Sequence, residues 1–153
     1  MKLVAGLGNP GRGYAATRHN AGFWFADRVA AKLGASFALE AKFAAEIAKA
    51  GDVKLKLGGG TAGHNGLRDI QAHLGTPGFW RLRLGIGHPR DTEAPEREVV
   101  DYVLKAPGAA DRAAIDAAID RALDAWPDIS TGDMERAMMW LHTRPREPGR
   151  DGP

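Results

Sequence analysis

The sequence contains no cysteine among its 153 residues. That absence excludes a disulfide framework, a thiolate metal site and a cysteine nucleophile. No apolar run approaches the roughly 20 residues that a membrane-spanning helix needs. Residues 1–7 are apolar but too short for a signal peptide, and glycines interrupt them at once. The chain is therefore expected to be a soluble cytoplasmic protein with no membrane partner.

Net charge is also small, because 21 Lys and Arg residues against 19 Asp and Glu residues leave a formal charge of +2. An excess of that size does not by itself indicate a nucleic-acid partner, so the positions of the basic residues matter more than their sum. Glycine, in contrast, is abundant, and many of the 20 glycines fall in three short clusters. Such clusters are typical of tight turns that approach a ligand closely.

Apolar periodicity predicts strands that alternate with helices. The expected strands are residues 2–7, 52–57 and 79–86, and the expected helices are residues 19–33, 67–74, 109–126 and 132–142. Residues 37–50 are ambiguous, since their alanines suit a helix while Phe37, Leu39 and Phe43 also fit alternating strands. This order predicts the α/β class, as a single domain over residues 1–142 with a mixed β-sheet flanked by helices. Residues 143–153, rich in proline, glycine and arginine, are expected to form a disordered tail.

The same periodicity predicts which side chains face the core. In the first helix they lie at steps of four, at Ala21, Phe25, Val29 and Leu33. In the long helix they are Ile115, Ile119, Ala122, Leu123 and Trp126. In the two alternating strands they are Val53, Leu55, Leu57, Trp80, Leu82, Leu84 and Ile86.

A glycine-rich turn follows the first expected strand, with the sequence Gly6-Leu7-Gly8-Asn9-Pro10-Gly11. It matches G-x-G-x-x-G, which in a dinucleotide-binding unit opens a helix whose N-terminus meets the pyrophosphate. Here the helical pattern starts about eight residues later, and the acidic residue expected about twenty positions further on is absent. The hypothesis of a dinucleotide-binding oxidoreductase therefore has this glycine run as its only support.

His19 opens the first expected helix. The positive end of a helix dipole lowers the pKa of an imidazole there and favours its neutral form. A neutral imidazole can act as a general base near neutral pH. The alternative is that His19 only occupies a helix start, and position alone favours this alternative.

A second glycine-rich loop, residues 58–66, joins an expected strand to an expected helix. Its backbone amides are suited to hold an anion or a carbonyl group. Asn65, near its end, is placed either to cap the helix or to present its amide to a substrate, and one position allows both roles.

Four basic residues lie on the non-core faces of the two alternating strands: Lys54, Lys56, Arg81 and Arg83. If those strands are neighbours, the four form a basic patch beside the glycine loop. The patch is either a solvated strand face or a surface that positions a phosphate-backbone ligand. His73, His88 and His142 are expected at the surface, and no spacing of histidines and acids indicates a metal site.

Together these residues resemble the bacterial peptidyl-tRNA hydrolase family. The matching blocks are GLGNPG at 6–11, YAATRHNAG at 14–22, KLGGG at 56–60, GHNGL at 63–67 and RLRLGIGHP at 81–89. The similarity extends over almost the whole chain, and the combination is far more specific than any single block. The resemblance implies a monomer that hydrolyses the ester linking a peptide to tRNA, without a metal or organic cofactor.

The resemblance also implies roles for particular residues. His19 would be the base that activates the attacking water, and Asn9 would help to distinguish a blocked from a free aminoacyl group. Tyr14 and Asn65 would contact the end of the peptidyl-tRNA. His64 would line the site, and the pair that grips the terminal phosphate of the tRNA would be Lys56 and Arg83.

The sequence departs from the family between Ala50 and Gly51, where the family has several dozen more residues. The missing part includes a Phe-Met-Asn motif, whose asparagine polarises or positions the substrate. It also includes a His-Asp-Glu-Leu-Asp-Leu motif on an interior strand, whose aspartate orients the catalytic histidine. Neither motif occurs in this sequence. The prediction is a hydrolase that binds tRNA ends poorly and works slowly, and the alternative is a relative that binds tRNA ends but has lost the chemistry.

Overall fold

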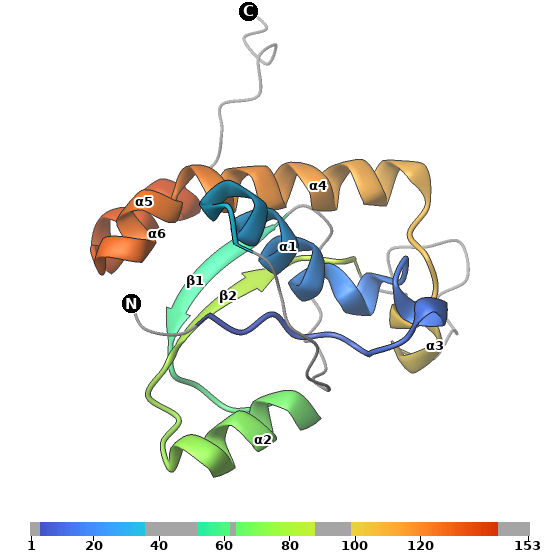
Figure 1. Cartoon of the computed structure of the whole chain (residues 1–153), viewed down its shortest axis with the longest axis horizontal. Helices are drawn as coiled ribbons and strands as arrows, with labels where there is room; N and C mark the ends of the chain where they lie inside the picture. Colours follow the sequence, from blue (N-terminus) through green and yellow to red (C-terminus); the bar gives the residue numbers. More distant parts are fainter. Residues whose placement is uncertain (1–3, 36–51, 62–63, 88–98, 144–153) are drawn as a thin grey trace, which may run out of the picture.

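The computed structural model describes residues 4–35, 52–61, 64–87 and 99–143. The elements before the middle of the chain are η1 (Arg12–Tyr14) and η2 (Arg18–Asn20), both 3-10 turns, and helix α1 (Ala21–Leu33). The middle of the chain forms β1 (Val53–Leu57), α2 (Asn65–Leu74) and β2 (Trp80–Leu84). The helices of the last part are α3 (Val99–Val103), α4 (Ala109–Asp124), α5 (Trp126–Thr131) and α6 (Met134–His142). Figure 1 shows α4 along one side of the molecule, α1 and the strands next to it, and α2 on the opposite side.

The two alternating segments pair as antiparallel strands, with Val53 opposite Leu84 and Lys56 opposite Arg81. Val53 and Leu55 face the core as expected, whereas Leu57 is exposed and so is Trp80, its partner across the strands. The expectation that these two residues are core residues is wrong. The apolar cluster formed by the helices reaches Val53 and Leu55 but does not extend to the last pair of the sheet.

The first expected strand does not form over residues 4–7, and only Gly8 makes an isolated bridge. A strand needs a partner along its length, and the sheet of the described residues consists of β1 and β2 alone. The segment is instead packed against α1 through two glycines. A Cβ on Gly6 would lie 2.6 Å from the carbonyl oxygen of Gly22, and one on Gly22 would lie 2.6 Å from the amide nitrogen of Leu7.

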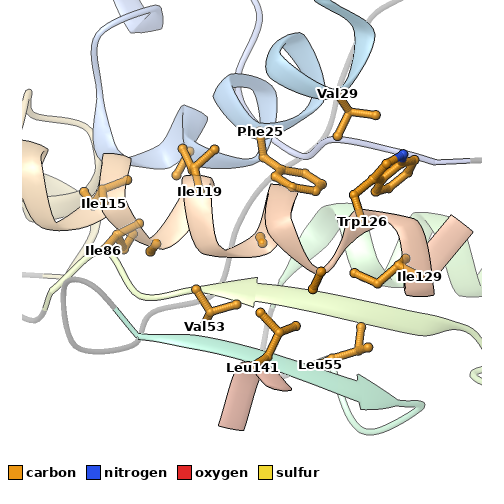
Figure 2. Packing of buried hydrophobic residues seen from close by; sticks show 14 of the residues in the cluster. Phe25, Val29, Val53, Leu55, Ile86, Ile115, Ile119, Trp126, Ile129 and Leu141 are labelled. Atoms are coloured by element: carbon orange, nitrogen blue, oxygen red, sulfur yellow. The ribbon is translucent and has the colours of Figure 1, made fainter. Parts of the chain in front are cut away.

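The core lies between α1, the C-terminal helices and the inner face of the strands (Figure 2). Ile115 and Ile119 of α4 are fully buried, and Phe25 of α1 meets Trp126 edge-on at 6.2 Å between ring centroids. The stripe predicted for α1 is confirmed except at Leu33, which is 62% exposed. Leu33 is the last residue of the helix, and Gly34 follows it in the left-handed conformation, so the chain turns away there.

The boundaries of the C-terminal helices differ from the prediction at Pro127. The prediction left residues 127–131 outside any helix, but Pro127 lies in the first turn of α5, where its missing N–H has no intrahelical acceptor in any case. α6 then starts after Asp133, whose carboxylate accepts a hydrogen bond from the N–H of Arg136 at 3.2 Å. Residues 37–50, His88 and residues 144–153 lie outside the described residues.

The described residues form a single domain of helices and sheet, in agreement with the predicted class. The sheet that they contain is an antiparallel pair flanked by helices. None of the described helices is long and apolar enough to span a bilayer.

Candidate active site

His19 lies in η2, the 3-10 turn just before α1, and its side chain is buried. Neither ring nitrogen has a hydrogen-bond partner among the described residues. Burial lowers the pKa of His19 below its ordinary value, because a charged imidazolium loses solvation there. The direction of this pKa shift agrees with the sequence prediction. Its cause is desolvation, whereas the sequence prediction rested on the helix dipole. At neutral pH the ring is therefore an uncharged base.

Asn9 is held next to His19 by a reciprocal pair of hydrogen bonds. The side-chain oxygen of Asn20 accepts from the amide nitrogen of Asn9 at 2.7 Å, and the Asn20 amide donates to the Asn9 carbonyl at 3.0 Å. Asn20 is buried, and both bonds use only the backbone of Asn9. The half-buried side chain of Asn9 therefore remains available to a ligand. Sequence reasoning missed Asn20, although it follows His19 directly.

Arg18 fixes the other side of this turn. Its guanidinium donates to the Ala106 carbonyl at 3.0 Å, pairs with Asp111 at 2.9 Å and stacks over Tyr102 at 4.1 Å from the ring centroid. The backbone N–H of Arg18 also donates to the Lys105 carbonyl at 3.2 Å. The turn that carries His19 is thus tied to the segment between α3 and α4. No periodicity in the sequence indicated this role.

His64 is the second buried histidine of the site, and it is the N-cap of α2. Its Nδ1 accepts a hydrogen bond from the N–H of Leu67 at 3.1 Å, so the neutral ring carries its proton on Nε2. Burial lowers the pKa of His64 to about 4, and the charges of His19 and, less strongly, Arg81 add to that effect.

Asn65 and Tyr14, the two residues expected to contact the tRNA end, are both exposed. The capping alternative for Asn65 is wrong, because His64 is the cap and Asn65 is the first residue of α2. The side-chain oxygen of Asn65 instead accepts a hydrogen bond from Arg68. Tyr14 ends η1, and its carbonyl accepts from the Thr17 hydroxyl at 2.8 Å.

The four basic residues of the strands come together as predicted but do not share one environment. Lys54 lies opposite Arg83 and Lys56 opposite Arg81, so Lys56 and Arg83 are diagonal neighbours across the pair. Lys54 and Lys56 are exposed and Arg83 is half-buried. Arg81 lies on the non-core face as predicted, opposite Lys56, but it is buried there, at 8% exposure. Its guanidinium points into the glycine loop, where the carbonyls of Gly59 and Gly60 accept hydrogen bonds from it.

The described residues contain no cluster of three His, Asp or Glu side chains that could hold a metal ion. The site in this part of the chain is made of two neutral imidazoles, asparagines, a glycine loop and basic side chains. Such a set can activate water and bind an anionic, hydrogen-bonding ligand. The first glycine run is followed by the short turns η1 and η2 rather than by a helix, so it lacks the geometry of a dinucleotide fingerprint.

Comparisons with known proteins agree with one family. A sequence model described as peptidyl-tRNA hydrolase matches residues 3–50 and 46–148. A peptidyl-tRNA hydrolase of Polynucleobacter asymbioticus is 41% identical over 193 aligned residues, which cover 94% of this chain and 98% of the relative. One of Bordetella avium is 42% identical over 191 residues, covering 94% of this chain and 92% of the relative.

Solved structures give the same result. The crystal structure of peptidyl-tRNA hydrolase from Acinetobacter baumannii is similar with a TM-score of 0.79 and 32% sequence identity. That similarity covers 90% of this chain and 92% of the crystallised one. Sequence and structure therefore lead to one conclusion: this chain belongs to the peptidyl-tRNA hydrolase family.

Proposed function

We propose that this chain hydrolyses the ester bond between peptide and tRNA in peptidyl-tRNA, with His19 as the general base. The imidazole takes a proton from water while the water oxygen attacks the ester carbonyl. The bond from the carbonyl carbon to the tRNA ribose oxygen then breaks, and the imidazolium returns its proton to that oxygen, which leaves as the free hydroxyl group. The observation that carries this proposal is the buried, uncharged ring of His19, whose two nitrogens are unpartnered among the described residues. A buried polar atom without a partner is unusual and commonly marks a functional position.

The surrounding residues supply the contacts that such a substrate needs. The side chain of Asn9 distinguishes a blocked from a free aminoacyl group, and its fixed backbone supports that role. Tyr14 and Asn65 contact the end of the substrate from exposed positions, and the buried, uncharged His64 lines the site. The tRNA phosphate is bound by Lys56 and Arg83, whose diagonal placement on the strands supports the pair.

A second function has a specific observation in its favour, namely a relative that binds tRNA ends but is impaired in catalysis. A general-base histidine works best when its second nitrogen is held by an acceptor that stabilises the imidazolium. No described residue supplies one to His19. The alignments with relatives run over 193 and 191 residues although the chain has 153, and the family model matches in two overlapping parts. Both facts support an internal segment missing between Ala50 and Gly51.

The experiment compares hydrolysis of an N-blocked aminoacyl-tRNA by this chain, by its His19→Ala variant and by the Acinetobacter baumannii relative. If His19 is the base, the variant loses hydrolysis while its affinity for tRNA stays within about twofold. A rate within about tenfold of the relative rules out the impaired alternative. Hydrolysis that survives in His19→Ala contradicts the role of His19, and tRNA binding without measurable hydrolysis in the parent chain favours the alternative.

We further propose that the protein is a cytoplasmic monomer, with residues 1–142 as the folded domain and residues 143–153 as a tail. Light scattering after size-exclusion chromatography tests the first part, since a mass near 16.3 kDa is expected. Limited proteolysis tests the second, with cleavage expected first beyond residue 142.

A further inference from the structure

Arg81 is a charged residue that the fold buries and holds by backbone carbonyls. It lies in β2 directly opposite Lys56, and only 8% of it is exposed. Burying a guanidinium is costly unless its N–H groups are satisfied. The fold gives backbone acceptors to both terminal nitrogens, whereas Nε has no hydrogen-bond partner among the described residues. Nη1 donates to the Gly60 carbonyl and Nη2 to the Gly59 carbonyl, each at 2.8 Å.

These two bonds require an arginine. The planar fork of a guanidinium reaches two consecutive carbonyls at once, which an ammonium group on a flexible chain does not reproduce. The guanidinium also stacks over Phe79 at 4.6 Å from the ring centroid, which fixes the plane of the fork. The Gly59 carbonyl accepts a weaker bond from Gln71 at 3.4 Å. Arg81 therefore determines where the carbonyls of this loop point.

The loop that Arg81 holds is the one that connects the proposed binding residues. Gly58 and Gly59 both have positive φ, 62° and 113°, a conformation that favours glycine. A Cβ built on Gly59 would lie 3.5 Å from the ammonium nitrogen of Lys56 and 3.8 Å from Nη1 of Arg81. The two cations thus approach the same glycine. Beyond the loop the chain reaches His64, the N-cap of α2.

The charge of Arg81 is not neutralised by these contacts, because carbonyl groups carry no net charge. It adds to that of Lys56 on one side of the loop, and on the other it contributes to keeping His64 uncharged. A positive potential that is fixed by backbone contacts, rather than cancelled by an acid, is what a phosphate site needs.

We propose that Arg81 is a positioning residue for the terminal phosphate of tRNA. It holds the Gly58–Gly60 turn so that Lys56 faces the phosphate, and it adds its own buried charge to that site. This inference rests on the proposed function, in which Lys56 and Arg83 grip the phosphate.

The test uses a synthetic RNA hairpin of the acceptor-stem type, prepared with and without its terminal phosphate. Binding to the full chain is compared for Arg81→Gln, which removes the charge and the fork, and for Arg81→Lys, which keeps the charge. The matched control is Arg28→Gln, which has the same change in net charge on the α1–α4 side of the fold, where Arg28 pairs with Asp116 and Asp120. Circular dichroism and unfolding curves establish that each variant is folded.

The expected result is that Arg81→Gln weakens binding of the phosphorylated hairpin by about tenfold and leaves binding of the other hairpin within about twofold. Arg81→Lys restores part of that difference, and Arg28→Gln changes neither affinity. In a double-mutant cycle with Lys56→Gln, the two effects are not additive, since both residues act on one phosphate. The ring signals of His64 in nuclear magnetic resonance titrate at higher pH in Arg81→Gln than in the parent chain.

Three outcomes overturn different parts of the proposal. Suppose that the parent chain prefers the phosphorylated hairpin. If Arg81→Gln then lowers the affinity for both hairpins equally, or changes neither affinity, Arg81 has no part in phosphate binding. If Arg81→Gln does not fold, the same comparison is made with Arg81→Lys, where an unchanged preference for the phosphate overturns the need for the fork. A parent chain that binds both hairpins equally overturns the phosphate site itself, and with it the proposed function of Lys56 and Arg83.

Discussion

At the scale of single residues, the site is built from buried polar groups whose partners come from distant parts of the chain. His19 and His64 are both buried, and their pKa values are both lowered mainly by loss of solvation. His64 also caps a helix, so its ring combines a structural and an electrostatic role. The two roles are separable by experiment, because capping needs an acceptor whereas the pH response needs a group that titrates.

The lowered pKa of His64 predicts a pH-dependent stability. The unfolded ring titrates near its ordinary value of 6.5 and the folded one at about 4, so the unfolded state binds more protons between these values. Stability is therefore full above pH 6.5 and is lost as the pH falls toward 4, by up to about 3 kcal/mol. His64→Asn keeps a capping acceptor but does not titrate. Denaturant unfolding at pH 7.5 and pH 5 should show a smaller difference for this variant than for the parent chain.

The exposed His73 provides the control for that experiment, since its side chain is 78% exposed. His73→Asn should leave the pH dependence as it is in the parent chain. Some pH dependence of the stability should persist in His64→Asn, because the pKa of His19 is also lowered. An equal loss of stability on acidification in the parent chain and in His64→Asn would contradict the prediction.

Asn9 and Asn20 allow stability and function to be separated at neighbouring positions. Asn20→Ala removes both buried hydrogen bonds to the backbone of Asn9 and should lower the free energy of unfolding by about 1–3 kcal/mol. Asn9→Ala keeps both bonds, so its stability should stay within about 0.5 kcal/mol of the parent while hydrolysis falls. Urea unfolding and the hydrolysis assay measure the two quantities. A large loss of stability in Asn9→Ala would show that its side chain has a structural partner.

At the scale of elements, the position of α1 depends on the absence of side chains at two places. Gly6 and Gly22 let the segment of residues 4–7 pack directly on the helix, with backbone against backbone. The same contact fixes the distance between the first glycine run and the turn that carries His19. The short turns and the helix thus form one unit around His19, the proposed general base.

A methyl group at this contact should therefore be destabilising. The Cβ of Gly22→Ala would lie 2.6 Å from the amide nitrogen of Leu7, against backbone that cannot rotate away. The expected loss is about 1–3 kcal/mol, or more if the helix must shift. Gly13→Ala is the matched control, because no atom lies within 4 Å of a Cβ there. Thermal unfolding of the two variants gives the comparison, and equal melting temperatures would contradict a close contact at Gly22.

At the scale of the whole molecule, the described residues line a half-open pocket of about 550 Å³ with a mainly apolar surface. It lies between the N-terminal segment, α1, α2, β2 and α5, and its lining includes Val4, Leu7, Phe25, Leu82, Ile86 and Trp126. Apolar side chains that face such a pocket lose packing contacts and stay in contact with water, which lowers stability. Our proposal of a missing internal segment is consistent with an open volume at this place.

This volume predicts a lower thermal stability than that of a relative with the longer chain. The protein should unfold in a single cooperative transition, at a melting temperature on the order of 5–10 °C below that of the Acinetobacter baumannii enzyme. Calorimetry on the two proteins in the same buffer measures both quantities. A melting temperature equal to that of the relative would show that the open volume does not lower the stability. Two separate transitions would contradict a single cooperative domain.

The sequence by itself determined the elements whose periodicity is strong, and the family. The stripes of α1 and α4, the alternation of β1 and β2, and the glycine turns were all predictable, because local spacing decides which face is apolar. The candidate residues His19, Asn9, His64, Asn65, Lys56 and Arg83 were found from motifs, and their roles remain predictions.

Only the tertiary structure decided which polar residues are buried and what they contact. Arg81 alternates like an exposed strand residue and shares the face of Lys56, yet the glycine loop buries it, with the carbonyls of Gly59 and Gly60 accepting hydrogen bonds from its guanidinium. Asn20 and Arg18 have no periodic signature, since their partners lie 11 and 93 positions away. Residues 4–7 read as a strand, but a strand forms only with a neighbour. Burial and pairing depend on which distant segments contact each other in the folded chain, and the local spacing of residues does not show those contacts.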